Sequence, residues 1–135
     1  MDVIEEEKKI ALNVYSEAVK YLSTLKRSLE KQSKFNNDLR YGICVICFEK
    51  LFVAYTAYMG FMAEHHMPLA LYNEAAGLDK EFPIEFKTIA QLVSKFESIC
   101  SLDGFGYKTP TNEDLETMIL GLIAIDEYIA PKINS

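Results

Sequence analysis

Residues 39–60, LRYGICVICFEKLFVAYTAYMG, decide the fold, because they are apolar on nearly every face of a helix. The sequence predicts that this helix begins after Asn36 or Asn37, either of which can cap it, and ends at about Glu64. A helix that is hydrophobic all round must be surrounded, by its own bundle or by a second subunit. We therefore expect it to be the most buried helix of the chain.

Two charges and two glycines interrupt this apolar helix. Glu49 and Lys50 lie near its middle and leave apolar pieces too short to span a bilayer, so we expect no membrane partner. Gly42 and Gly60 each cost about 1 kcal/mol in a helix interior. We expect both glycines to allow the close approach of a neighbouring backbone.

The sequence predicts further helices before and after this one along the chain. It predicts no β-strand. The first runs from about Val3 to Lys31, and its apolar residues recur in steps of four and three, as in the seam of an antiparallel bundle. A short helix lies between Pro68, which fits its first position, and Gly77, which fits its C-terminal stop. The stripe of the first helix is Ala11, Tyr15, Ala18, Leu22, Leu25 and Leu29.

The predicted ends of the last two helices are marked by prolines and by a threonine that can cap a helix. Pro83 fits the first turn of a helix that reaches about Ser101. The last helix starts near Thr111, whose spacing from Asp114 is that of a capping box, and we expect Pro131 to end it. Their apolar stripes are Phe86, Ile89, Val93, Phe96 and Cys100, then Leu115, Met118, Leu122, Ile125 and Ile129. Together these segments predict an all-α, up-and-down bundle of four long helices and one short helix. A length of 135 residues suits a single domain, 1–135.

The charge distribution argues against a nucleic-acid partner. The net charge is −6, and residues 67–135 carry five basic and eleven acidic side chains, which repel a phosphate backbone. The N-terminal sequence MDVIEEEKK is unlike a secretory signal. Three cysteines, an odd number, suit free thiols in a reducing compartment, so we expect a cytoplasmic protein.

Two short motifs that could carry chemistry fit a structural role better. Cys44 and Cys47 form a C-x-x-C inside a helix without a second pair, whereas zinc sites present four ligands, mostly from turns; we expect core cysteines. His65 and His66 are the only histidines, and no carboxylate lies at the Glu-x-x-His spacing of di-iron bundles. We expect no catalytic residue, no metal and no cofactor. An enzyme that uses Glu64 with the two histidines is the remaining alternative.

A ligand pocket is conceivable near Glu49, Lys50 and Tyr55. A buried carboxylate has a raised pKa and can mark a functional pocket. The alternative is that Glu49 forms a structural ion pair or lies at a solvent-facing rim. Aromatic side chains at helical spacing are more often part of a core than of a cofactor site, which favours the structural interpretation of Tyr55.

The order of these segments resembles the HEPN (higher eukaryotes and prokaryotes nucleotide-binding) superfamily. The likeness rests on IALNVYSEAVKYLSTL (10–25), LRYGICVICFEKLFVAYTAYMG (39–60) and GYKTPTNEDLETMILGLIAIDEYI (106–129). Catalytic HEPN members are ribonucleases with an Arg-x(4–6)-His motif near the start of the final helix. This chain has only Arg27 and Arg40, and its last histidine is His66. The resemblance therefore implies a non-catalytic member that dimerises or partners another protein such as a nucleotidyltransferase.

The sequence leaves two main functions open. The first is a non-catalytic interaction module, a homodimer or the partner of another protein; the second is a small-ligand or nucleotide-binding bundle. We expect a homodimer, because four residues beyond the main stripes look like a second apolar face that water would otherwise meet. These are Val14 and Tyr21 on the first helix, and Ile119 and Ile123 on the last.

Overall fold

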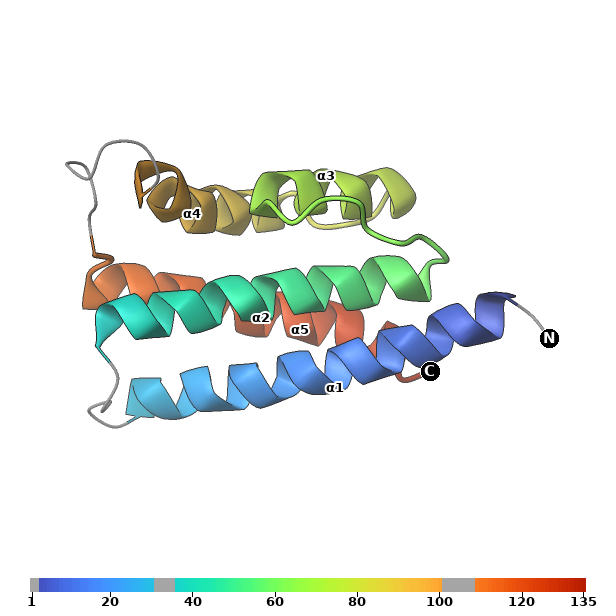
Figure 1. Cartoon of the computed structure of the whole chain (residues 1–135), viewed down its shortest axis with the longest axis horizontal. Coiled ribbons are helices and arrows are strands. Elements are labelled where there is room, and N and C mark those ends of the chain that lie inside the picture. The colour runs from blue at the N-terminus through green and yellow to red at the C-terminus, as the bar shows by residue number, and fades with distance from the viewer. Residues whose placement is uncertain (1–2, 31–35, 101–108) are drawn as a thin grey trace.

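The computed structural model describes residues 3–30, 36–100 and 109–135, and every regular element within them is an α-helix. The all-α prediction is therefore confirmed. The helices follow one another along the chain as shown in Figure 1. They are α1 (Val3–Glu30), α2 (Asn37–Tyr58), α3 (Pro68–Leu78), α4 (Glu85–Cys100) and α5 (Asn112–Ile133).

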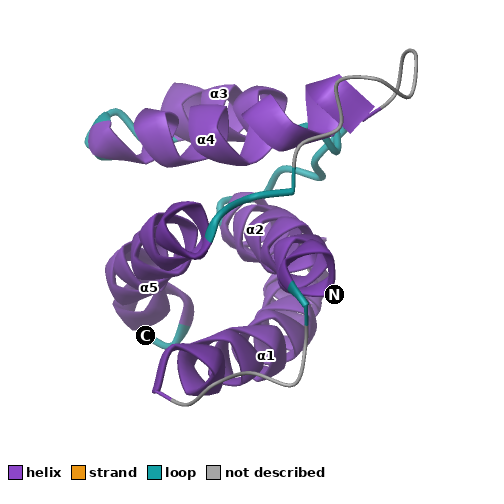
Figure 2. Ribbon diagram, turned by 90° about the vertical axis from the view of Figure 1, so that its left-hand side faces the viewer, coloured by secondary structure: helices purple, strands orange, loops and turns teal. Residues whose placement is uncertain are grey.

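The helices form two layers. Helices α1, α2 and α5 make a three-helix bundle. Helices α3 and α4 form a second layer, which packs against α2 and α5 (Figure 2). The four long helices alternate in direction along the chain, so α2 and α5 run parallel (Figure 1). The short helix α3 also runs parallel to α2, because residues 59–67 lead back along α2 before α3 begins.

The predicted caps at the starts of α2 and α5 are confirmed. The Asn36 side chain accepts a hydrogen bond of 2.8 Å from the backbone N–H of Leu39. Thr111 and Asp114 exchange two bonds of 3.0 Å, which complete a capping box. The two starts lie side by side, since the Asn37 carboxamide donates to the carbonyl of Pro110 at 3.0 Å.

The predicted end of α2 is wrong. The helix ends at Tyr58, six residues before Glu64, because Gly60 adopts φ +88°. This left-handed conformation is one that glycine takes without strain and that breaks the ladder of helical hydrogen bonds. The chain then leaves the axis of α2, and residues 61–66 are not helical.

Three other predicted boundaries shift. Gly77 is not the stop of α3, which continues to Leu78 with Asp79 as its C-cap. Pro131 does not end α5, which continues to Ile133, because proline's own φ is helical and only one backbone bond is lost. Helix α4 begins at Glu85, after a turn in which the N–H of Phe86 bonds to the carbonyl of Pro83. The ends predicted at Lys31 and Ser101 lie outside the described residues.

The core lies between the two layers and within the three-helix bundle. Helix α2 supplies eleven buried residues, against eight from α5, so the prediction that it is the most buried helix is confirmed for the described residues. Phe48 and Phe52 stack at 4.3 Å between ring centroids, and each is at most 1% exposed. The predicted apolar stripes of α1 and α5 face this core along their whole length. The stripe of α4 faces it up to Phe96, and the side chain of Cys100 lies outside the described residues.

Close approach of two helices occurs at a glycine other than the predicted ones. A Cβ added to Gly121 in α5 would lie 2.5 Å from Cδ1 of Ile89 in α4. No atom comes within 4 Å of the corresponding position at Gly42, and Gly60 meets only Oε2 of Glu7, at 3.2 Å. The close-approach role predicted for Gly42 and Gly60 is thus wrong, since one faces open space and the other ends a helix.

Candidate functional site

The predicted ligand residues Glu49, Lys50 and Tyr55 each contact a different part of the molecule. Oε2 of Glu49 lies 2.7 Å from Nδ1 of His66. Nζ of Lys50 donates to Glu17 on α1 at 2.6 Å. The hydroxyl of Tyr55 points into the molecule and is treated below. The structure therefore does not bring the three side chains together.

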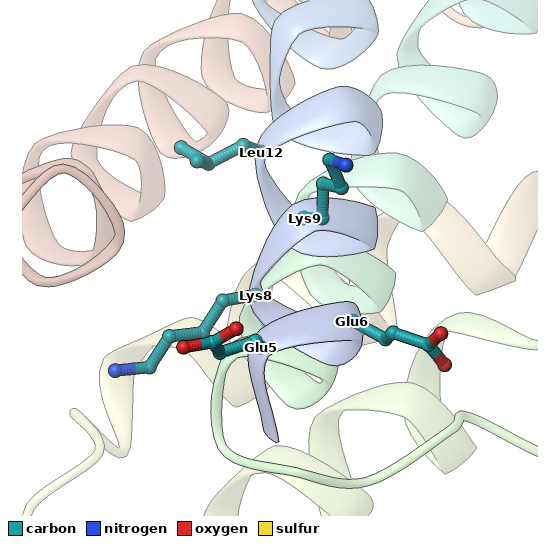
Figure 3. A pocket seen from close by; sticks show the side chains of 5 residues that line it. All are labelled: Glu5, Glu6, Lys8, Lys9 and Leu12. Carbon is teal, nitrogen blue, oxygen red and sulfur yellow. The ribbon is translucent and has the colours of Figure 1, made fainter. Parts of the chain in front are cut away.

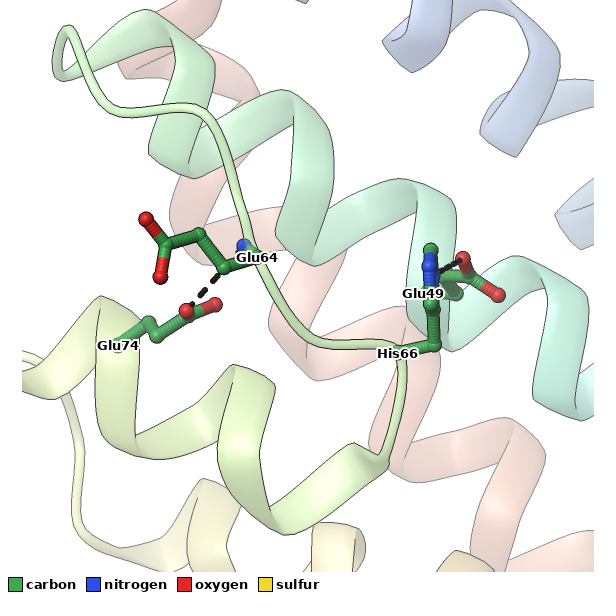
Figure 4. Close-up of polar contacts among 4 residues, drawn as sticks. All are labelled: Glu49, Glu64, His66 and Glu74. Carbon is green, nitrogen blue, oxygen red and sulfur yellow. Dashed lines mark hydrogen bonds and ion pairs between the residues drawn. The ribbon is translucent and has the colours of Figure 1, made fainter.

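Glu49 belongs to a set of polar contacts that hold residues 61–66 between α2 and α3 (Figure 4). The backbone N–H of Glu64 donates to Oε2 of Glu74 at 3.4 Å, and Nε2 of His65 lies 3.9 Å from the same oxygen. The His66 side chain is 80% exposed and that of Glu49 34% exposed, so their pair lies at a solvent-facing rim. This matches the rim interpretation of Glu49.

These histidines do not form a metal centre with other side chains in the described parts of the chain. No group of three or more His, Cys, Asp or Glu residues there could hold a metal ion. His65 and His66 point to different carboxylates, Glu74 and Glu49. The arrangement provides two separate surface contacts and no shared site at which water or substrate could be activated.

The Lys50–Glu17 pair links α2 to α1. The hydrogen bond from Lys50 lowers the pKa of Glu17, and the same bond raises the pKa of Lys50. Both groups therefore stay charged at neutral pH. A surface ion pair of this kind contributes little to stability.

Asp79 is the centre of a polar cluster that the sequence did not reveal. Its Oδ2 accepts hydrogen bonds from the hydroxyls of Tyr55 at 2.6 Å and Tyr128 at 2.8 Å. Its Oδ1 accepts the backbone N–H of Glu81 at 3.0 Å, and the Lys132 ammonium lies 4.6 Å from the centre of the Tyr128 ring. The cluster joins α2, α5 and the connection between α3 and α4, so it fastens the second layer to the bundle.

The protonation states in this cluster are well defined. Burial acts to raise the pKa of Asp79, but the bonds from Tyr55, Tyr128 and Glu81 outweigh it, and the pKa is lowered. Burial, followed by the bond to Asp79, raises the pKa of Tyr128 to about 12 and that of Tyr55 further. At neutral pH the cluster is a carboxylate that accepts from two neutral phenols.

Cys44 and Cys47 are free, buried thiols, as the sequence predicts. Burial raises the pKa of Cys44 to about 12 and raises that of Cys47 further, so neither is a thiolate at neutral pH. The Cys47 thiol faces the backbone carbonyl of Ala18 on α1, at 3.7 Å. A neutral, enclosed thiol is neither a nucleophile nor a metal ligand, and these residues pack as core.

An exposed apolar surface remains on α2. We call it the α2 face and define it by Leu39, Gly42, Ile43, Ile46 and Val53, which recur at helical spacing; the charged Lys50 lies between Ile46 and Val53 on the same face. Leu39 is 49% exposed and Ile46 40% exposed. The open space around Gly42 lies on the same face. The helix predicted to need surrounding on every side is thus left partly uncovered by the described parts of its chain.

The four residues predicted to form a dimer face are mostly used inside one chain. Ile119 is fully buried, so its assignment to an outer face is wrong: the packing of α5 against the rest of the core covers it. Val14, Tyr21 and Ile123 are half-buried and pack against the core.

Two surface hollows accompany these features. One, of about 400 Å³, lies along the first turns of α1, where the side chains of Glu5 and Lys8 point away from those of Glu6 and Lys9 (Figure 3). The other, of about 520 Å³, is lined from the start of α3 and from α4 by Met67, Leu69, Gln91, Ser94 and Lys95. Neither hollow is lined by Glu49, Lys50 or Tyr55.

Helix α2 is also the one helix in the described ranges that is long and apolar enough to cross a membrane. In the fold, 56% of its most apolar window is buried against other helices. Length and apolar character of this kind are shared by core helices, and α2 has the packing of one.

No protein family, curated protein or solved structure matches the chain.

Proposed function

We propose that the chain is a non-catalytic helical-bundle interaction module that forms a homodimer through the α2 face. The observation that carries this proposal is the exposure of Leu39 and Ile46 on the helix with the most buried residues. Apolar surface on such a helix is stabilised when a second apolar surface covers it. Gly42 adds a point at which another helix can approach closely, since no described residue comes within 4 Å of a Cβ added there.

A two-fold interface is the simplest way to cover this face. In a homodimer the same patch meets itself, so the α2 face of one chain supplies the apolar surface that the other needs. A specific interface buries about 1,200–2,000 Å² in total. The α2 face therefore has to be joined by flanking side chains, and the half-buried Ile43 and Val53 extend it along the helix.

Three further properties belong to this proposal. The chain is not an enzyme and needs no cofactor, and its place is the cytoplasm. The resemblance to non-catalytic HEPN domains supports the dimer, and it makes a protein partner such as a nucleotidyltransferase the second candidate. A small-ligand site near Glu49 and Lys50 ranks behind both, because these two side chains already contact His66 and Glu17.

Sedimentation of three proteins tests the homodimer. The wild-type chain is expected at twice its 15.4 kDa monomer mass at micromolar concentration. Ile46→Glu places a charge on the α2 face and should yield monomer. Leu120→Glu changes a leucine on α5 that is more exposed than Ile46, 52% against 40%, and should remain dimeric. A monomeric wild-type chain, or a dimer that Ile46→Glu leaves intact, contradicts the proposal.

A further inference from the structure

Arg40, in the first turn of α2, is a buried cation without an anionic partner among the described residues. It is 7% exposed, and no carboxylate of the described chain lies within ion-pair distance of it. Its Nη1 makes two long contacts of 3.4 Å, to Oδ1 of Asn37 and Oδ1 of Asn112, and both acceptors are neutral amides. Its Nε is buried and has no hydrogen-bond partner in the part of the chain that the structure describes.

Neutral groups nearby do not compensate this charge. Cys44 lies one turn further along α2, and the Arg40 charge acts to lower its pKa, but burial keeps that pKa at about 12 and the thiol neutral. An unpaired buried charge is costly, and buried cations in proteins are as a rule paired with an anion. Among the described residues, the charge of Arg40 has no anion beside it.

The position of Arg40 favours an anion in a second way. The starts of α2 and α5 meet at this end of the bundle, because Asn37 bonds to the carbonyl of Pro110 just before α5. Each helix start carries a partial positive charge of roughly half an elementary charge. The carboxylate of Asp114 caps α5 and satisfies the N–H of Thr111, so a further anion would be held by the guanidinium.

We propose that Arg40 binds a small oxyanion at the junction of α2 and α5. The contacts to Asn37 and Asn112 use Nη1, and the buried Nε has no hydrogen-bond partner among the described residues, so in this proposal the ligand binds to the edge formed by Nε and Nη2. That edge presents two parallel N–H groups at the spacing of two oxygens of a phosphate or carboxylate, which gives a bidentate pair. Asn37 and Asn112 both contact the guanidinium at Nη1, the nitrogen outside this edge.

Inorganic phosphate is the probe for this site. Thermal unfolding and ³¹P NMR line width would be measured in phosphate and in chloride at the same ionic strength and pH. We expect phosphate to raise the melting temperature of the wild-type chain and to broaden the phosphate resonance. Sulfate is expected to compete. Equal melting temperatures in phosphate and chloride, with an unchanged line width, would overturn the proposal.

The two arginines of the chain supply a matched pair of variants. Arg40→Gln should weaken phosphate binding at least about tenfold, whereas Arg27→Gln, on the exposed last turn of α1, should leave it unchanged. Arg40→Lys keeps the charge but loses the two-pronged edge, and should weaken binding as well; it also serves if Arg40→Gln fails to fold. Equal binding by the Arg40 and Arg27 variants would refute the site. Neither result depends on the oligomeric state of the chain.

Discussion

Replacing Tyr55 by phenylalanine should destabilise the fold by about 1–2 kcal/mol. The change removes the 2.6 Å bond to Asp79 and keeps the ring, which stacks on Phe82 and Tyr58. A hydrogen bond to a charged group contributes about 1.5–3 kcal/mol. The lower range is appropriate here because Asp79 is only partly buried and keeps the bond from Tyr128, so water replaces part of the lost interaction.

The pH dependence of this loss has a definite sign. The folded state lowers the pKa of Asp79, so the stabilisation is present above the ordinary aspartate pKa of about 3.9 and is lost as the pH falls through the lower, folded value. The folded state raises the pKa of Tyr55, so its contribution is complete below about pH 10 and is lost as the pH rises through the folded pKa. The difference between wild type and Tyr55→Phe should therefore be largest near neutral pH and shrink below about pH 4.

Urea unfolding at neutral and acidic pH measures this difference. Tyr58→Phe is the control, since Tyr58 stacks beside Tyr55 and its hydroxyl bonds to no described residue. That control should change the free energy of unfolding by less than about 0.5 kcal/mol. A Tyr55→Phe loss that equals the control, or one that is the same at acidic and neutral pH, would show that the bond to Asp79 does not stabilise the fold.

Three further substitutions test the packing, each by urea unfolding. Phe52→Ala should cost about 3–5 kcal/mol, because the ring is 1% exposed; a loss under about 1 kcal/mol would show that it is not core. Gly60→Ala should cost about 1–2 kcal/mol, since alanine is strained at φ +88°, and an unchanged stability would contradict that conformation. Gly121→Ala should cost about 1–3 kcal/mol because its Cβ would overlap Ile89, and Ile89→Val in the same chain should recover part of the loss.

The parts of the fold that depend on local chemistry were predictable. The caps at Asn36 and Thr111 and the stripes of the amphipathic helices follow from residue type and spacing, and the structure has them. The end of α2 was not predictable in this way, because Phe61 and Met62 continue the apolar pattern past a glycine whose backbone angle decides the matter.

The contacts that depend on three-dimensional neighbours could not be read from the sequence. Asp79 lies in an ordinary charged turn, and only the fold brings Tyr55 and Tyr128 to it from 24 and 49 residues away. The contact between Gly121 and Ile89 likewise depends on how α4 crosses α5. Glu49, Lys50 and Tyr55 are close in sequence, but their side chains reach different neighbours, so proximity along one helix did not predict a shared site.

The packing of α5 against α1 and α2 has a consequence for synthesis. Tyr15 on α1 donates to Asp126 on α5 at 2.7 Å, across 111 positions of the chain. At translation rates of about 5–20 residues per second, about 5–20 s pass between the synthesis of Tyr15 and the synthesis of Asp126. During that interval an α1–α2 hairpin would present to the cell the apolar faces that α5 later covers. A nascent chain stalled before α5 is therefore the form of this protein most exposed to chaperones and to aggregation.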